Sequence, residues 1–416
     1  MLIKQKKVFG WVLYDWANSS FATTVMAGFF PVFFKNYWSK GADVSLSTAR
    51  MGVANSIAGL LVALLSPILG SIADKLSKRK AFLFIFTLLG VLSTSSLYLV
   101  SEGNWEIAAI VYILAIIGFS GSNTFYDSLL IFVSKEKEMD FISSLGYSIG
   151  YLGGGVLFAL NVWMTLSYEY FGFNDVSQAV KTSFLMVGVW WLLFSVPVFL
   201  FVKEERAVKS EKFKAIEAFK NVLTDKKVLL FLLAYWFYID GVDTIIRMAV
   251  DYGLSIGFES KDLITALLIT QFVGFPFAII FGFIGEKIGT HRGILIAIFI
   301  YLAVSIWGAF MDSVTEFYVL AVVIGLVQGG IQSLSRSYFG KLIPEKRSGE
   351  YYGVYNMLGK FAAVLGPLLV GFVSYFISRL GYEKIAPRLG IASISILFLI
   401  GGTMFVYSLK QSRKKN

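Results

Sequence analysis

The sequence predicts an all-α membrane protein in which twelve transmembrane helices form two pseudo-symmetric six-helix bundles. Three observations predict this fold: the composition, the spacing of the apolar segments and a set of polar motifs that occurs twice. Of the 416 residues, 56% are hydrophobic and only 15% are charged, whereas a soluble domain has roughly 25% charged residues. Such a composition is typical of a chain that crosses a bilayer several times.

Twelve apolar segments are long enough to cross a bilayer, since a helix needs about 20 residues to do so. We expect these spans near residues 9–36, 49–73, 81–101, 105–133, 143–168, 180–202, 228–254, 262–286, 293–311, 315–340, 349–377 and 388–409. The first span follows the basic stretch MLIKQKK directly. Its apolar part is longer than the core of a removable signal peptide, so we interpret it as a retained helix.

A long basic segment, residues 203–227, separates the sixth span from the seventh. It divides the chain into an N-terminal bundle, residues 1–202, and a C-terminal bundle, residues 228–416. Four apolar residues recur in this linker at roughly helical spacing among the lysines: Phe213, Ile216, Val222 and Leu223. The pattern predicts an amphipathic helix on the membrane surface, and a solvated charged loop would explain it equally well.

The distribution of Lys and Arg predicts the orientation of the spans. The loops on the N-terminal side of the membrane hold 26 of these residues and the opposite loops hold 8. Because basic loops stay in the cytoplasm, both termini and the linker should be cytoplasmic, with the protein in the inner (plasma) membrane. The same bias explains the formal net charge of +10 without a nucleic-acid partner.

Several ionisable residues remain inside the predicted spans. They are Asp15, Asp127, Asp240, Asp243, Arg247, Arg336 and Lys360. A charge near the middle of the membrane costs about 3 kcal/mol, so such side chains face the bundle interior, pair with one another or line a hydrated cavity. Together with the nearby amides of Asn18 and Gln332, we predict that they bind the substrate or couple its transport.

Three polar motifs occur once in each half of the chain and in the same order. Residues 15–19 and 240–244 both read D-x-x-[ND]-[ST]. Asn123 precedes Asp127-Ser128 by four residues as Gln332 precedes Arg336-Ser337, and G-x-x-x-[DE]-K begins at Gly70 and at Gly282. The offsets lie between 209 and 225 residues. Each match is weak alone, but together they indicate a duplicated six-helix unit, with substrate bound between the halves.

The spacing of the charges suggests chemistry for a zwitterionic substrate. Asp243 and Arg247 lie four residues apart on one face of the seventh span, with Asp240 one turn before them. An Arg side chain suits a carboxylate through its planar fork, and a carboxylate suits an ammonium group. The alternative is an ion pair between Asp243 and Arg247 that only neutralises itself.

Asp15 and Asp240 are candidates for proton coupling. A carboxylate can take up and release a proton when its surroundings alternate between a desolvated and a cation-rich state. Neither residue has a basic neighbour three or four residues away within its span. The alternative is a carboxylate that accepts hydrogen bonds from helix hydroxyls such as Ser19 or Thr244.

The remaining intramembrane charges suggest a gate. Asp127 could pair with Arg336 or Lys360 across the halves when one side of the transporter closes, although a sequence cannot show such pairing. Five aromatic residues flank the charges and are candidates for a cavity wall, with ordinary packing as the alternative. They are Tyr14, Trp16, Tyr126, Trp236 and Tyr238.

The loop after the second span resembles the signature of the major facilitator superfamily. Its residues are Gly70, Asp74, Lys75, Ser77, Lys78 and Arg79, with Ser77 where the signature has glycine. The resemblance implies that the aspartate belongs to a charge network that latches the cytoplasmic side, with Glu286 and Lys287 at the corresponding place in the second half. A polar loop that only sets the topology is the alternative.

Longer stretches resemble one family of that superfamily, the vacuole-effluxer-like family. They are YDWANSSFATTV (14–25), TFYDSLL (124–130), SSLGYSIGYLGGG (143–155), YIDGVDTI (238–245), QGGIQSLSRSYFGKLIP (328–344) and GKFAAVLGPLL (359–369). The resemblance implies a central cavity lined by helices 1, 4, 7 and 10. It also implies secondary-active transport by alternating access, with amino-acid efflux as the family's associated activity. It does not by itself transfer a substrate.

Other classes of protein are disfavoured by what the sequence lacks. There is no cysteine and a single histidine, His291, so we expect no metal, no cofactor and no enzymatic site. No G-x-x-x-x-G-K-[ST] loop is present to bind ATP. The expected partners are a small-molecule substrate, protons and the lipid bilayer, with the protein a monomer. A lipid or lysolipid translocase and a non-transporting receptor are the alternative functions.

Overall fold

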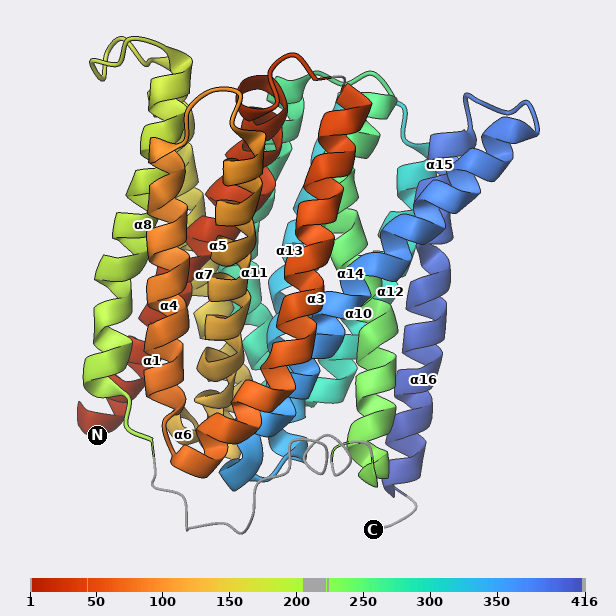
Figure 1. Ribbon diagram of the computed structural model, residues 1–416. Helices are drawn as coiled ribbons and strands as arrows, with labels where there is room; N and C mark the ends of the chain where they lie inside the picture. The colour runs from red at the N-terminus through yellow and green to blue at the C-terminus, as the bar shows by residue number, and fades with distance from the viewer. Residues whose placement is uncertain (1, 43, 205–221, 223, 414–416) are drawn as a thin grey trace. The chain divides into compact units, whose positions relative to one another are not determined.

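The computed structural model describes every residue except Met1, Asp43, 205–221, Leu223 and 414–416 (Figure 1). All regular secondary structure in this described part is helical, which confirms the predicted all-α fold. The predicted amphipathic helix of the linker lies mostly outside the described residues.

The helices of the first half correspond to the first six predicted spans. They are α1 (Leu2–Ser20), η1 (Phe21–Phe29), α2 (Phe30–Phe33), η2 (Phe34–Trp38), α3 (Val44–Leu76), α4 (Arg79–Ser96), η3 (Leu97–Leu99), α5 (Trp105–Ser128), α6 (Leu130–Val133), η4 (Glu136–Glu138), α7 (Met139–Leu166) and α8 (Val176–Phe201). Those of the second half are α10 (Lys226–Ser255), α11 (Ser260–Ile288), α12 (Thr290–Phe310), α13 (Val314–Leu342), η5 (Glu345–Arg347), α14 (Ser348–Arg379), α15 (Ala386–Ser393) and α16 (Ser395–Arg413).

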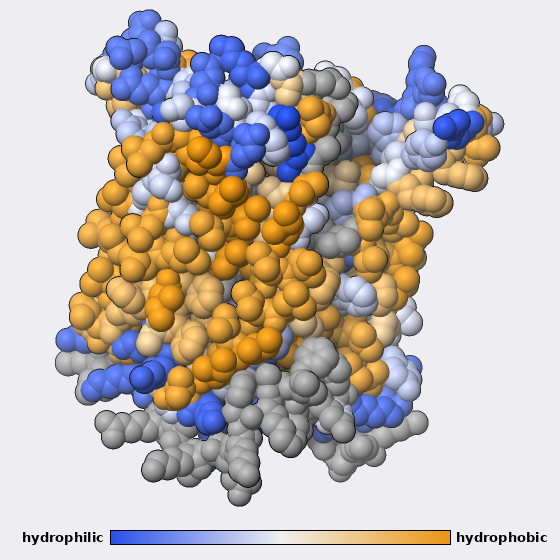
Figure 2. Space-filling model, in the orientation of Figure 1, coloured by the Kyte–Doolittle hydropathy of each residue, from blue (hydrophilic) through white to orange (hydrophobic). Residues whose placement is uncertain are grey.

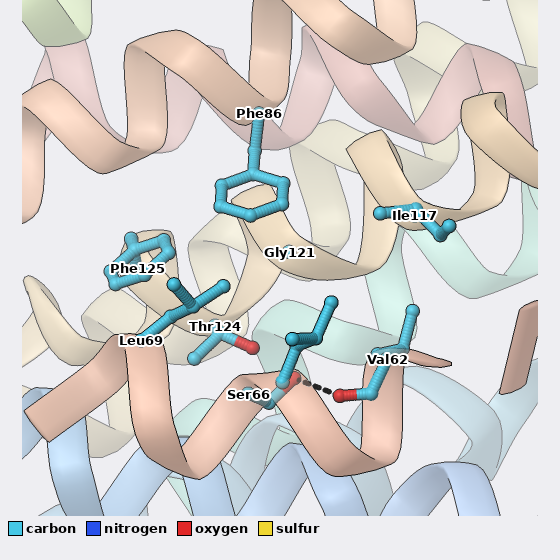
Figure 3. Close-up of a pocket in the computed structure, with 9 residues that line it drawn as sticks. Val62, Ser66, Leu69, Phe86, Ile117, Gly121, Thr124 and Phe125 are labelled. Carbon is cyan, nitrogen blue, oxygen red and sulfur yellow. Dashed lines mark hydrogen bonds between the residues drawn. The ribbon is translucent and has the colours of Figure 1, made fainter. Parts of the chain in front are cut away.

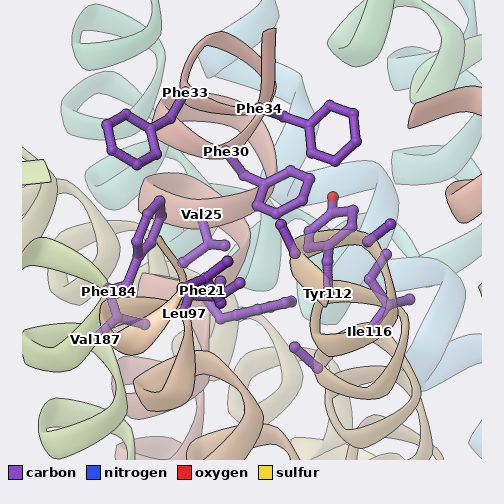
Figure 4. Packing of buried hydrophobic residues seen from close by; sticks show 14 of the residues in the cluster. Phe21, Val25, Phe30, Phe33, Phe34, Leu97, Tyr112, Ile116, Phe184 and Val187 are labelled. Carbon is purple, nitrogen blue, oxygen red and sulfur yellow. The ribbon is translucent and has the colours of Figure 1, made fainter. Parts of the chain in front are cut away.

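The first span changes its hydrogen-bond pattern along its length. From α1 it passes into the π-helical segment η1, then into α2 and a second π-helical segment, η2. π turns occur mostly as local bulges, frequently at functional sites. The apolar side chains of this part pack into a cluster with α5 and α8, in which Phe30 stacks on Tyr112 at 3.6 Å between ring centroids (Figure 4).

Ten helices of the described residues are long and apolar enough to cross a membrane. The first predicted span is outside this set: its α-helical part, α1, carries three lysines and Asp15, and the more apolar part that follows is divided by π-helical segments. The eleventh contributes only the shorter apolar helix Leu365–Arg379, although α14 as a whole covers the predicted range. The twelfth is divided into α15 and α16 at Ile394.

The chain forms two compact units. Residues 135–148, from the first half of the sequence, belong to unit 2, and residues 348–353, from the second half, belong to unit 1. Unit 1 holds Met1–Ser134, Ile149–Phe213 and Ser348–Gly353, and unit 2 holds the rest. The helices α7 and α14 therefore each contribute to both units.

The packing inside unit 1 is repeated inside unit 2, as expected for a duplicated sequence. In unit 1, α1 packs on α8, α3 and α4 pack on α5, and α4 packs on α8. In unit 2, α10 packs on α16, α11 and α12 pack on α13, and α12 packs on α16. Apolar residues cover the middle of the helices on the drawn surface, and polar residues gather near their ends (Figure 2). This distribution suits a multi-pass membrane protein.

Candidate functional site

Asp15 lies inside unit 1 and is only 7% exposed. Its Oδ2 accepts a hydrogen bond from the Tyr126 hydroxyl at 2.7 Å. The Trp11 ring stacks on Tyr126 at 4.4 Å between centroids, and its indole N–H donates to the Tyr126 carbonyl at 3.0 Å. The aromatic residues at 11 and 126 therefore hold the carboxylate of α1 against α5.

The neighbours of Asp15 on α1 also contact other helices of unit 1. The Asn18 amide donates to the Asn123 amide oxygen at 2.6 Å, and the Tyr14 hydroxyl shares a hydrogen bond with Thr87 at 2.7 Å. Trp16 stacks on Trp190 of α8 at 5.4 Å between centroids. Of the predicted cavity aromatics, Tyr14, Trp16 and Tyr126 are thus held by packing or hydrogen bonds within the unit, which is the alternative considered for them.

Asp240 of α10 is fully buried in unit 2. Its two carboxylate oxygens lie 3.0 and 3.1 Å from the backbone nitrogen of Gly366 in α14, which donates to them. The Thr244 hydroxyl donates to Oδ1 at 3.3 Å. Sequence reasoning named Thr244 as a donor, but the backbone donor on α14 could not be seen in it.

The other predicted residues of α10 differ in burial: Tyr238 is fully buried, whereas Trp236, Asp243 and Arg247 lie closer to the surface of unit 2. Asp243 is half-buried and the Arg247 side chain is exposed, so their pairing stays a prediction. Tyr238 shares a hydrogen bond with Ser335 of α13 at 2.7 Å, and the half-buried Trp236 packs on Phe237.

Arg336 of α13 is 2% exposed and is held by the first turns of α7, also within unit 2. Its guanidinium donates to the Ser143 hydroxyl at 2.9 Å and to the Ser143 carbonyl at 2.8 Å. It also lies over the Tyr147 ring, 4.3 Å from the centroid. Gln332 of the same helix is half-buried.

Two predicted intramembrane charges remain without a described role. Asp127 of α5 is 7% exposed within unit 1, and its suggested pairing with Arg336 stays a prediction. The side chain of Lys360 lies outside the described part of the chain.

The loop motif forms a polar cluster in unit 1 that we name the Asp74 latch. Asp74 accepts hydrogen bonds from the backbone N–H groups of Gly349 and Glu350 at 2.9 and 2.8 Å, and it pairs with Arg79 at 2.7 Å. The first N–H groups of a helix have no partner in that helix, and its dipole favours a negative charge there. The carboxylate therefore suits the start of α14. Lys75 and Lys78 are exposed, whereas Arg79 is 1% exposed.

An acidic residue just after the sixth span, Glu204, adds to the Asp74 latch. Glu204 accepts hydrogen bonds from the backbone N–H groups of Arg79 at 2.8 Å and Lys80 at 3.3 Å, so its carboxylate satisfies the start of α4. Burial raises the pKa of Glu204, and the two N–H donors lower it. This residue was not among the predicted site residues.

Ser77, at the glycine position of the motif, has a left-handed backbone with φ = 51°. Its N–H donates to the Asp74 carbonyl and the N–H of Lys78 donates to the Ala73 carbonyl, which is the Schellman arrangement at a helix end. A side chain in this region is strained, and glycine is not.

We expect Ser77→Gly to stabilise the protein by about 1 kcal/mol relative to Ser77→Ala, because only glycine relieves the strain. Thermal unfolding in one detergent measures the difference. Equal midpoints for the two variants would contradict a strained turn.

A second polar cluster, which we name the Asp140 latch, lies in unit 2 and was not predicted. Asp140 of α7 is 1% exposed; its Oδ1 pairs with Lys341 at 2.7 Å and accepts from Ser337 at 2.6 Å, and its Oδ2 accepts from Thr290 at 2.7 Å. Lys341 also donates to Thr290 at 2.9 Å. By contrast, Glu286 is exposed.

A sequence signal for Asp140 did exist. Glu136-Lys137 precedes it as Glu345-Lys346 precedes Glu350, at the same offset of about 210 residues as the other motifs. Both pairs form 3₁₀ turns, η4 and η5, immediately before the long helices α7 and α14. The repeat places the two acids at equivalent helix starts, but only the structure shows that both are buried.

A small pocket in unit 1 lies away from these polar clusters (Figure 3). It is lined by Val62, Leu65, Ser66, Leu69, Phe86, Ile117, Gly121, Thr124 and Phe125 of α3, α4 and α5. The Ser66 and Thr124 hydroxyls donate to carbonyls of their own helices. The pocket therefore offers an apolar surface rather than a polar binding site. In the described part of the chain, no three His, Cys, Asp or Glu side chains are grouped to hold a metal ion.

Comparison with known proteins supports one family. The model of the family described as "Vacuole effluxer Atg22 like" matches residues 46–415. The uncharacterized MFS-type transporter YxiO of Bacillus subtilis is 38% identical over 94% of this chain and 92% of its own length. Autophagy-related protein 22 of Eremothecium gossypii is 23% identical over 89% of this chain and 85% of its own length.

Solved structures show the same fold at low identity. The human organic anion transporter MFSD10 (TETRAN) superposes with a TM-score of 0.71 and 14% identity, over 97% of this chain and 98% of its own. At this identity the likeness shows the fold alone, which is that of the major facilitator superfamily. With the family match over most of its length, the chain belongs to the vacuole effluxer Atg22-like family.

Proposed function

We propose that the protein is a secondary-active transporter that exports a small polar or zwitterionic solute, an amino acid in the first instance, by alternating access. The observation that carries this proposal is the burial of ionisable side chains in the middle of apolar helices. Asp15, Asp127, Asp240 and Arg336 are each at most 7% exposed. Charged groups inside membrane helices are costly and mark substrate or ion pathways.

Two further features support the proposal. The names of relatives in the family refer to transport and to vacuolar efflux. The Asp74 and Asp140 latches each join the start of a long helix to other helices of one unit, and such contacts can open and close as discrete states. We further propose that the protein is a monomer in the plasma membrane with both termini in the cytoplasm.

Proton coupling by Asp15 and Asp240 is the part of the proposal that a transport assay tests directly. Coupling between two ligands is typically about 1–3 kcal/mol, or roughly 5- to 150-fold in affinity. We expect Asp15→Asn and Asp240→Asn each to reduce amino-acid transport driven by a pH gradient in proteoliposomes by about tenfold or more, since neither can release a proton. Exchange of labelled for unlabelled substrate should persist.

The matched control is Glu106→Gln, which removes an exposed carboxylate outside the predicted site residues and should leave gradient-driven transport unchanged. Unchanged gradient-driven transport in both aspartate variants would eliminate the coupling role. A ligand-stabilisation screen of amino acids, peptides and lysolipids on the purified protein should identify the substrate class.

A lipid or lysolipid translocase is the second candidate, because α3 exposes an apolar stripe. Its members include Val53, Ile57, Leu60, Leu61, Leu64 and Ile68. An apolar face of this kind contacts acyl chains. Stabilisation by lysolipids and not by amino acids in the same screen would favour this candidate.

A further inference from the structure

The carboxylate of Asp240 holds a backbone group of another helix in the middle of the apolar region. Both of its oxygens lie within 3.1 Å of the Gly366 nitrogen, and the donor geometry directs the N–H of α14 at α10. In a regular α-helix that N–H would point along the helix axis to a carbonyl one turn earlier. The contact with Asp240 therefore adds an acceptor from another helix to this N–H.

The residue after Gly366 is a proline, which weakens the helix at the step that Asp240 contacts. Pro367 lies inside α14, where its ring clashes with the preceding turn and its nitrogen donates no hydrogen bond. Proline and glycine are tolerated in transmembrane helices when neighbouring groups satisfy the freed backbone. Asp240 accepts from the N–H of Gly366 at this step.

The close approach of the two helices requires a glycine on α14. A Cβ on Gly366 would lie 1.7 Å from the Thr244 hydroxyl oxygen and 2.9 Å from Asp240 Oδ1. In unit 1, a Cβ on Gly150 of α7 would likewise lie 2.6 Å from the Ser19 hydroxyl oxygen. The Asp15 carboxylate accepts from the Tyr126 side chain, whereas the Asp240 carboxylate accepts from a helix backbone.

The helix that Asp240 holds is also the helix that the Asp74 latch holds. Gly349, whose N–H donates to Asp74, precedes Gly366 by 17 residues on α14. That separation corresponds to about 26 Å along an α-helix. Two buried carboxylates from different parts of the chain thus hold one helix by its backbone N–H groups.

We infer that Asp240 is a positioning residue for α14: its carboxylate fixes the helix at the Gly366–Pro367 step, and its neutralisation releases the helix as far as its first turn at Asp74. The charged side chains that act on Asp240 are Asp243 and Arg247, both on α10 itself. The contact between Asp240 and Gly366, which we call the anchor, needs no assumption about transport. Its role in a transport cycle rests on the proposed function.

The anchor is tested by hydrogen–deuterium exchange of the purified protein. Asp240→Leu removes both acceptors, and Asp240→Asn keeps the shape but removes the charge. We expect the peptide covering residues 361–372 to exchange about tenfold faster or more in Asp240→Leu, since a hydrogen bond to a charged group protects the amide. Asp240→Asn should give a smaller increase. Asp15→Asn, the matched acid of the other repeat, should leave this peptide unchanged.

A second readout tests whether the release travels along α14. Because the chain has no cysteine, Ser348→Cys places one thiol at a buried position in the first turn of α14. We expect a maleimide to label it several-fold faster when Asp240→Asn is added, an effect that a purely local carboxylate would not produce. Unchanged exchange of residues 361–372 would contradict the claim that Asp240 holds α14 at Gly366. Unchanged labelling at position 348 would contradict the claim that losing this contact also loosens the first turn of α14.

The two proposals fail in different assays. If exchange and labelling rise as expected but gradient-driven transport is unaffected in Asp240→Asn, the anchor stands and the coupling role falls. If transport is lost while exchange and labelling stay at wild-type values, the coupling role stands and the anchor falls.

Discussion

Lys341→Met should destabilise the protein by about 3 kcal/mol, because it leaves the Asp140 carboxylate buried without its cation. The side chain of Asp140 is 2% exposed and that of Lys341 is 20% exposed, so solvent screens the pair little. Two hydroxyls, from Ser337 and Thr290, still donate to the carboxylate, which sets the expected value at the lower end for a broken buried pair.

A double-mutant cycle separates the pair from general damage to the fold. Asp140→Asn removes the stranded charge, so the double variant with Lys341→Met should be more stable than Lys341→Met alone. The matched control is Lys287→Met, an exposed lysine, which should change stability by no more than about 0.5 kcal/mol. Unfolding of all four proteins in the same detergent supplies the measurement. Simple additivity of the two single changes would show that Asp140 and Lys341 are not coupled.

Gly70→Ala should open the Asp74 latch. A Cβ at this position of α3 would lie 2.1 Å from the Gly349 carbonyl oxygen and 2.7 Å from its carbon, and these backbone atoms cannot rotate away. The first turn of α14 must therefore shift, and the hydrogen bonds from Gly349 and Glu350 to Asp74 should be lost. Overpacking of this kind costs about 1–3 kcal/mol.

The same helix offers a matched control for this substitution. Gly59 also lies on α3, but a Cβ there would meet no atom within 4 Å. We expect maleimide labelling of Ser348→Cys to rise about tenfold in Gly70→Ala, as a loss of roughly 1.4 kcal/mol would produce, and to stay at its starting rate in Gly59→Ala. Equal labelling rates in the two variants would argue against a close contact between α3 and α14 as the basis of the latch.

Most of the candidate site could be predicted only as a list of residue types on particular spans. Hydropathy identified the helices, and the cost of a charge in a membrane identified Asp15, Asp127, Asp240 and Arg336 as buried, which they are. The hydrogen-bond partners of these side chains could not be predicted in the same way. Asp15 binds a tyrosine hydroxyl of α5 and Asp240 binds a backbone N–H of α14, and both contacts depend on how helices distant in sequence pack together.

The Asp140 latch shows why some buried charges could not be predicted from the sequence. Asp140 precedes the predicted fifth span, and hydropathy gave no reason to distinguish it from the other acids of the same loop, the exposed Glu136 and the half-buried Glu138. It is buried because the start of α7 packs within unit 2 while the remainder of the helix belongs to unit 1. Whether a residue at a helix end is buried depends on which other helices pack against it, and the local sequence does not show this.

The sequence by itself determined the membrane class, the number and order of the spans, the duplication and the family, because these depend on composition and local pattern. Only the tertiary structure decided which groups satisfy the buried charges. Asp74 and Asp240 both hold the backbone of α14, and Asp140 and Arg336 are held across α7 and α13. Hydrogen bonds to buried charges require atoms within about 3 Å, and residues hundreds of positions apart reach that distance only when the helices have packed.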